Sequence, residues 1–240
     1  MSEVRETLRA MDEEMHGARP WLQLPPEWVA PDEQVLDRGV GRTRSALGSM
    51  DPKRLGSMRD HDSPLLEWLP PSHKDEVGAA DVLSAVLASG TIPAHAVHRL
   101  LAPNPERSAV LSALRSLGPT DLYLSNGDTL SRMEHLLVDV TIALAGTESD
   151  RRSAIAEALC ARLRPSLFPL PSSALHHALG MPASSSHRTT WVLLRHVLQD
   201  DDVRAELYRL EDRVYDRGPV HGGGWTELRL VQLSLVAGVE

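Results

Sequence analysis

The sequence predicts a mainly α-helical protein built as a multi-helix bundle. From Val77 onward, apolar residues recur three and four positions apart, as they do on the buried face of a helix. Glycines and helix-capping residues interrupt this pattern at short intervals, and the alternation typical of strands is nearly absent. We therefore expect residues 77–240 to form one domain of helices joined by short connections.

Residues 1–76 differ in character and are predicted to form an irregular N-terminal arm containing proline and tryptophan. An amphipathic helix over 2–16 is followed by a segment whose prolines remove backbone donors and favour extended geometry. Glycine, serine and weak periodicity predict a loop over 38–61. Exposed tryptophans would form an apolar patch, so we expect the arm to anchor itself, or to bind a partner, through Trp21, Trp28 and Trp68.

Start and stop signals divide the first half of the helical domain. Asn104 as N-cap, Pro105 in the first turn and Gly118 as the stop define one helix clearly. The predicted helices are 79–90, 93–103, 105–117, 128–146 and 147–163. The expected N-caps of the last two are Asp128 and either Thr147 or Ser149. The apolar face of the first is expected to contain Val82, Leu83, Val86 and Leu87.

A proline-rich stretch then separates two helical regions. Pro165 ends a helix, and Pro169 predicts an extended crossing over 166–170, buried through Leu167 and Phe168. A short helix is predicted next, capped by Ser172 or Ser173 and ended by Gly180. One or two helices follow over 189–216, with Asp200–Asp202 at a helix N-terminus. A last helix is expected after the linker Gly222–Gly224.

Composition excludes several classes of function. The net charge of −8 over 240 residues argues against a strongly basic nucleic-acid binder. Only one cysteine is present, so an internal disulfide and a multi-cysteine zinc site are excluded. The charged N-terminus and the lack of a long apolar run predict a cytoplasmic protein without a membrane span.

No metal or cofactor is expected. The pairs His95 with His98 and His176 with His177 lack a third ligand nearby, and the H-E-x-x-H pattern is absent. These histidines are interpreted as surface or half-buried side chains. The lone Cys160 lies on an apolar helix face, which favours a core residue over a nucleophile.

Three short motifs carry a resemblance to a known family. Residues 161–169 read A-R-L-R-P-S-L-F-P, and two further motifs lie upstream, at 81–86 and 92–101. Together they resemble an uncharacterised actinobacterial family, a domain of unknown function, over roughly residues 62–236. That family is in turn similar to helix-hairpin-helix DNA glycosylases, so the resemblance implies a degenerate form of that fold.

The same resemblance places a damaged catalytic site in this chain. The position of the glycosylase aspartate is Ser172, and no lysine follows Lys74. Ser172 provides no carboxylate to act as a general base. The hairpin would be residues 144–148, where Glu148 replaces the second glycine and opposes an incoming phosphate. Arginines offset this in part, so the DNA-binding candidates are Gly146, Thr147, Arg151, Arg152, Arg162 and Arg164.

From these residues we expect a non-catalytic helical interaction module that binds a protein partner or a second copy of itself. The alternative is a DNA-associated protein that keeps weak backbone contacts through its arginines. The two readings predict different salt dependence, because phosphate contacts release counterions and weaken as salt rises.

Overall fold

The computed structural model describes residues 24–51, 75–170, 172–182, 184–215 and 226–237. Within these residues the chain forms ten α-helices, one short 3₁₀ helix and no strand. The α-helices are α2 (Glu33–Ser49), α5 (Ala79–Ser89), α6 (Ala94–Leu101), α7 (Pro105–Leu117), α8 (Gly127–Ala143), α9 (Ser149–Leu163), α10 (Ser173–Leu179), α11 (His187–Gln199), α12 (Asp201–Tyr215) and α13 (Glu227–Ala237). The predicted mainly α-helical bundle is confirmed.

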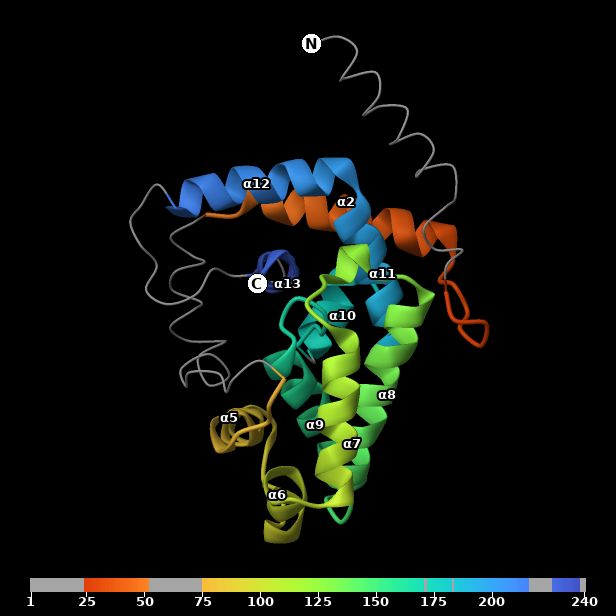
Figure 1. The fold of residues 1–240 in the computed structure, drawn as a ribbon. Helices are drawn as coiled ribbons and strands as arrows, with labels where there is room; N and C mark the ends of the chain where they lie inside the picture. The colour runs from red at the N-terminus through yellow and green to blue at the C-terminus, as the bar shows by residue number, and fades with distance from the viewer. Residues whose placement is uncertain (1–23, 52–74, 171, 183, 216–225, 238–240) are drawn as a thin grey trace, which may run out of the picture.

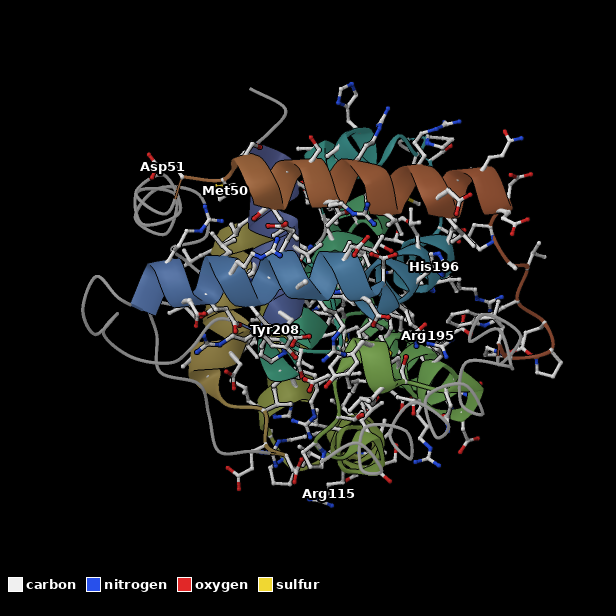
Figure 2. All side chains as sticks on the ribbon, turned by 90° about the horizontal axis from the view of Figure 1, so that it is seen from above. Met50, Asp51, Arg115, Arg195, His196 and Tyr208 are labelled. Atoms are coloured by element: carbon white, nitrogen blue, oxygen red, sulfur yellow. The ribbon has the colours of Figure 1, made fainter. Side chains whose placement is uncertain are left out.

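The helices are arranged along the length of the molecule. Figure 1 shows α7, α8 and α9 running lengthwise, with α5 and α6 at one end and α2 and α12 at the other. Figure 2, seen from above, shows α2 and α12 side by side, with His196 of α11 close to where α12 begins. Helix α13 packs against α2, α10, α11 and α12, and nine of its eleven residues are buried. It is therefore the central helix at this end.

Helix α2 corrects the prediction of a loop over 38–61, which is wrong for residues 38–49. The Asp32 side chain accepts a hydrogen bond from the Gln34 amide at 2.8 Å and so caps the helix. Leu36 and Leu47 are buried in the same hydrophobic cluster as the C-terminal helices. Gly39 permits close approach, since a Cβ there would lie 2.7 Å from Leu193 Cδ1. The division of the chain at residue 77 stays a prediction.

Most predicted helix boundaries agree with the structure, and two N-caps differ. Asn104 accepts from the Arg107 amide at 2.7 Å, as expected. Helix α8, however, is capped by Asn126, which accepts from the Thr129 amide at 2.9 Å, while Asp128 lies in the first turn. An aspartate in the first turn is itself favoured by the helix dipole, which explains the misassignment. Helix α9 begins after Glu148, which makes no side-chain cap hydrogen bond.

The buried face of α5 is rotated relative to the expected one. Val82 is buried, whereas Leu83 and Leu87 are about half exposed, at 49% and 51%. The reason is an ion pair between Asp81 of α5 and Arg162 of α9, whose side chains are 1% and 6% exposed. This pair turns the small residues of α5 toward α9 and leaves the larger ones outside.

The proline-rich crossing forms a turn at first and becomes irregular only at its end. The amides of Leu167 and Phe168 both donate to the Arg164 carbonyl at 3.0 Å, which closes a turn over 165–168. The expectation of an extended segment is therefore wrong for these residues, because Arg164 supplies a free carbonyl at the end of α9. The predicted burial of Leu167 and Phe168 is confirmed, at 0% and 2% exposed.

Three expectations lie outside the described residues: the helix over 2–16, the contacts of Trp21 and Trp68, and the glycine linker at 222–224. No helix in the described part of the chain is both long and apolar enough to cross a membrane.

Candidate functional site: a pocket around the proline-rich turn

A pocket of about 170 Å³ lies where the turn after α9, helix α10 and the start of α11 meet. Its lining combines an apolar wall with several hydroxyl groups, two imidazoles and one carboxyl group. The lining residues are Glu157, Phe168, Pro169, Leu170, Ser172, Ser173, Leu175, His176, Ser185, His187, Thr190 and Trp191.

Local sequence signals build this pocket. Pro165 ends α9 and the turn that follows brings Phe168 inward. Ser172 then accepts a hydrogen bond from the Leu175 amide at 3.2 Å and starts α10, as predicted. Gly180, with φ of 73°, ends α10 after seven residues. The short α10 therefore presents Ser172 and its neighbours toward the start of α11.

Aromatic rings form the apolar wall. Phe168 meets Trp191 edge to face, with ring centroids 5.3 Å apart. The His187 ring lies 4.9 Å from the same tryptophan. Edge-to-face packing at such separations adds about 0.5–1.5 kcal/mol to the burial of the rings. Phe168 and Trp191 are each only 2% exposed, so they form a closely packed apolar wall with little accessible surface.

Glu157 is the only carboxyl group among the described lining residues. Burial raises the pKa of this side chain above its ordinary value of 4.5. Among the described residues, no hydrogen-bond donor or cation pairs with it. Its charge also helps burial to raise the pKa of the Cys160 thiol. The pocket thus contains a carboxylate that is partly removed from water and has no partner in the part of the chain that the structure describes.

His176 is held by a chain of two hydrogen bonds. Its Nε2 lies 3.0 Å from the Thr190 hydroxyl, which lies 3.1 Å from the Ser186 carbonyl. A hydroxyl group has one hydrogen and the carbonyl can only accept, so the Thr190 hydroxyl donates to Ser186. The neutral imidazole must then carry its proton on Nε2. Nδ1 of His176 is left as a hydrogen-bond acceptor.

A polar cluster behind the pocket contains Glu134 of α8. This carboxylate accepts from Nε1 of Trp28 at 3.2 Å and from Nε of Arg188 at 2.7 Å. Nε2 of His187 lies 3.7 Å from the same carboxylate. Burial lowers the pKa of His187, and the attraction of Glu134 only partly opposes this shift. Trp28 is thereby held against α8 and α11, with its ring 5.9 Å from that of Trp191.

Four of the predicted DNA-binding residues gather at the α8–α9 loop. Gly146 is exposed with φ of 91°, and Thr147 is buried beside it. Arg151 is 58% exposed and pairs with Glu148 at 3.3 Å, while Arg152 donates to the Thr147 carbonyl at 2.9 Å. The arginines thus contact the loop that they flank.

The other two predicted DNA-binding arginines lie in the interior. Arg162 is paired with Asp81 inside the α5–α9 interface. Arg164 is 7% exposed and donates to Asp75 and to the Leu114 carbonyl. A buried guanidinium cannot reach a phosphate without unfolding its surroundings. The structure therefore separates Arg162 and Arg164 from the four candidates at the α8–α9 loop.

The histidine pairs form no metal centre among the described residues, where no group of three potential ligands is found. His95 lies near the Ala145 carbonyl, at 3.2 Å, and His176 contacts Thr190. Cys160 is fully buried and burial raises its thiol pKa, as a core residue requires.

Sequence reasoning missed Glu157, although one signal was present. Glu148, the N-cap residue of α9, has Arg151 three residues ahead of it. Glu157 has only Ser153, Ala154, Cys160 and Ala161 at helical spacing, so no cation on its own helix can pair with it. An acidic residue in an apolar stretch, with no cation on its own helix, indicates either an ion pair with another element or a binding site.

The comparisons with known proteins agree with the motifs. The family of unknown function DUF6308 matches residues 62–229, which is more than half of the chain. No curated protein and no solved structure shows a significant match. The relationship to helix-hairpin-helix glycosylases and the actinobacterial source stay predictions. The matched segment runs from before α5 into α13 and contains every residue that lines the pocket, and the chain belongs to the DUF6308 family.

Proposed function

We propose that this protein is a non-catalytic helical binding module whose binding site is the pocket around Glu157. One observation carries the proposal: a partly buried carboxylate faces an aromatic pocket and has no partner among the described residues. Leaving a polar group desolvated and unpaired costs about 1–3 kcal/mol, and more for a charge. A ligand, or a side chain of a protein partner, would relieve that cost on binding.

The chemistry of the lining supports binding rather than catalysis. The Ser172 hydroxyl accepts a hydrogen bond from the Leu175 amide as a helix cap, and the imidazole of His176, which also lines the pocket, is hydrogen-bonded to Thr190. A serine nucleophile needs a base within hydrogen-bond reach, and no such pair is found among the described residues of the pocket. We therefore expect no base excision from purified protein.

A pocket-filling variant tests the proposal. Ser173 lines the pocket from α10, so Ser173→Phe should block it, whereas His177→Phe places the same ring on an exposed part of that helix. Small fragments are screened by NMR against the wild-type protein. Those that shift the signals of Phe168 and Trp191 should lose binding in Ser173→Phe and keep it in His177→Phe. The site would be refuted if fragments bind only elsewhere on the protein, or if Ser173→Phe leaves their affinity unchanged.

A second candidate function is weak binding to a nucleic-acid backbone at the α8–α9 loop. The N-terminus of α9 has no side-chain cap, and the exposed Arg151 lies in its first turn. Amide groups of an uncapped helix N-terminus favour an anion. Glu148 opposes it, so any affinity is expected to be low.

Salt dependence tests this second candidate. Binding to a labelled duplex is measured by fluorescence anisotropy at several salt concentrations. Arg151→Gln should reduce the salt slope by about one if Arg151 contacts a phosphate. The control is Arg115→Gln, an exposed arginine at the other end of the α7–α8 pair, which should change nothing. Binding that is independent of salt, or that is equal in both variants, would exclude this interface.

A further inference from the structure

We infer that the pocket binds a planar nitrogen cation of the guanidinium or amidinium type, with its N–H groups directed at Glu157. The inference rests on the proposed function and specifies the ligand of the same site. It follows from three properties of the lining: its charge, its hydrogen-bonding capacity and its shape.

The charge of the lining selects against anions. Among the described residues that line it, Glu157 is the only carboxyl group, and none is a lysine or arginine. An anionic ligand would meet the Glu157 carboxylate in a partly desolvated site, where repulsion is screened less than in water. A cation would instead supply the partner that Glu157 lacks among the described residues.

The hydrogen-bonding groups favour a ligand rich in donors. A carboxylate only accepts, and in a neutral His176 the tautomer selected by Thr190 leaves Nδ1 as an acceptor as well. The Ser172 hydroxyl can donate or accept. A guanidinium carries five N–H donors and no acceptor, and it meets a carboxylate with two parallel hydrogen bonds. Amides and most heterocycles also carry acceptors, to which the Glu157 carboxylate cannot donate.

The shape of the pocket favours a small flat group. Its volume of about 170 Å³ is below the roughly 300–1,000 Å³ typical of pockets for drug-sized ligands. Phe168 and Trp191 line this small space with apolar side chains, which leaves room for one planar group. A single ring or the end of one side chain is the size that fits.

Three probes of the same shape test the charge requirement: benzamidine, benzamide and benzoate, which are cationic, neutral and anionic at pH 7.5. Dissociation constants are measured by NMR titration of the full chain. Benzamidine should bind at least tenfold more tightly than benzamide, and benzoate should not bind. Equal affinity for benzamide, or tighter binding of benzoate, would overturn the inference.

Variants of Glu157 test its role in this preference. Glu157→Gln keeps the shape of the side chain and removes the charge, so the tenfold preference should fall to about one. Glu148→Gln is the matched control at the start of the same helix and should retain the full preference. Glu157→Met provides the same test if the glutamine variant does not fold. A preference that survives loss of the Glu157 charge would exclude this residue as the recognition group.

The source of the cation is distinguished with two further probes. Methylguanidine represents a free small molecule, and the peptide Gly-Gly-Arg-Gly-Gly represents an arginine side chain of a protein partner. Tighter binding of the peptide supports a protein partner, and equal or tighter binding of methylguanidine supports a small molecule. Binding of neither would contradict the inference.

Failure of the inference can be separated from failure of the proposed function. If all three ring probes bind equally and Ser173→Phe abolishes their binding, the pocket is a binding site for a ligand of other chemistry. If no probe and no fragment perturbs the pocket residues, both proposals are wrong.

Discussion

Two charged side chains on helix α9 lie only five residues apart and have opposite environments. Arg162 is 6% exposed and pairs with Asp81 across the α5–α9 interface. Glu157 lines a pocket, is only partly buried and has no partner among the described residues. In the interface, the opposite charge of Asp81 offsets the desolvation of Arg162. In the pocket, no charge among the described residues offsets the desolvation of Glu157. This difference separates a structural charge from one that is available to a ligand.

The largest effect is expected from breaking the paired region. Arg162→Met should lower the free energy of unfolding by about 3–5 kcal/mol, because it leaves Asp81 buried without its partner. Urea denaturation measures the loss. Adding Asp81→Asn, which keeps an acceptor for the Gly78 amide, should recover much of it. A loss below about 1 kcal/mol would show that the pair is not buried.

The pocket wall should respond almost as strongly to truncation. Phe168 is 2% exposed and packs edge to face on Trp191. Phe168→Ala should cost about 3–5 kcal/mol, because it removes a buried ring and opens a cavity beside the pocket. Thermal and urea unfolding provide the measurement. A cost below about 1 kcal/mol would mean that the turn is peripheral and the pocket poorly defined.

The cap of α10 should have an intermediate effect. Ser172→Ala removes the hydrogen bond from the Leu175 amide and should cost about 0.5–2 kcal/mol. Ser173→Ala is the matched control, since Ser173 is exposed and follows the cap, and it should be nearly neutral. The reverse order of the two costs would make Ser173, and not Ser172, the N-cap of α10.

The smallest effect is a change in the pH dependence of stability. Burial raises the folded-state pKa of Glu157 above 4.5, so its contribution to stability is fully present below pH 4.5 and is lost as pH rises through the raised pKa. Glu157→Gln should remove this loss, and the wild-type and variant melting temperatures should diverge above pH 4.5. Parallel curves throughout would show that Glu157 is solvated. Glu148→Gln is the control.

The sequence predicted the helical architecture well, because the helices are amphipathic and carry clear caps. Asn104, Ser172 and Gly180 stand where capping chemistry requires them. Helix α2 was missed, since its glycines and serines resemble a loop and its apolar positions are few. One of those glycines, Gly39, serves close packing against Leu193, and the sequence alone does not reveal that partner.

The candidate site was less predictable than the fold. The prolines around Ser172 indicated a break between two helical regions, and the pocket forms at this break. Its charge comes from Glu157 on the preceding helix, and its aromatic wall comes partly from Trp191 on the following one. Which side chains meet depends on how α9, α10 and α11 pack together, and periodicity does not determine that packing. The interior positions of Arg162 and Arg164 could not be anticipated for the same reason.

The packing of α13 between elements far apart in sequence has a consequence for folding kinetics. Helix α13 contacts α2, so the core at this end joins opposite ends of the described chain. Such contacts close large loops and raise the contact order, which slows folding. During synthesis, the part of α2 that packs on α13 stays uncovered until α13 has left the ribosome. The α7–α8 pair forms from neighbouring segments and can assemble earlier, so we expect this local unit to precede the closure of the core.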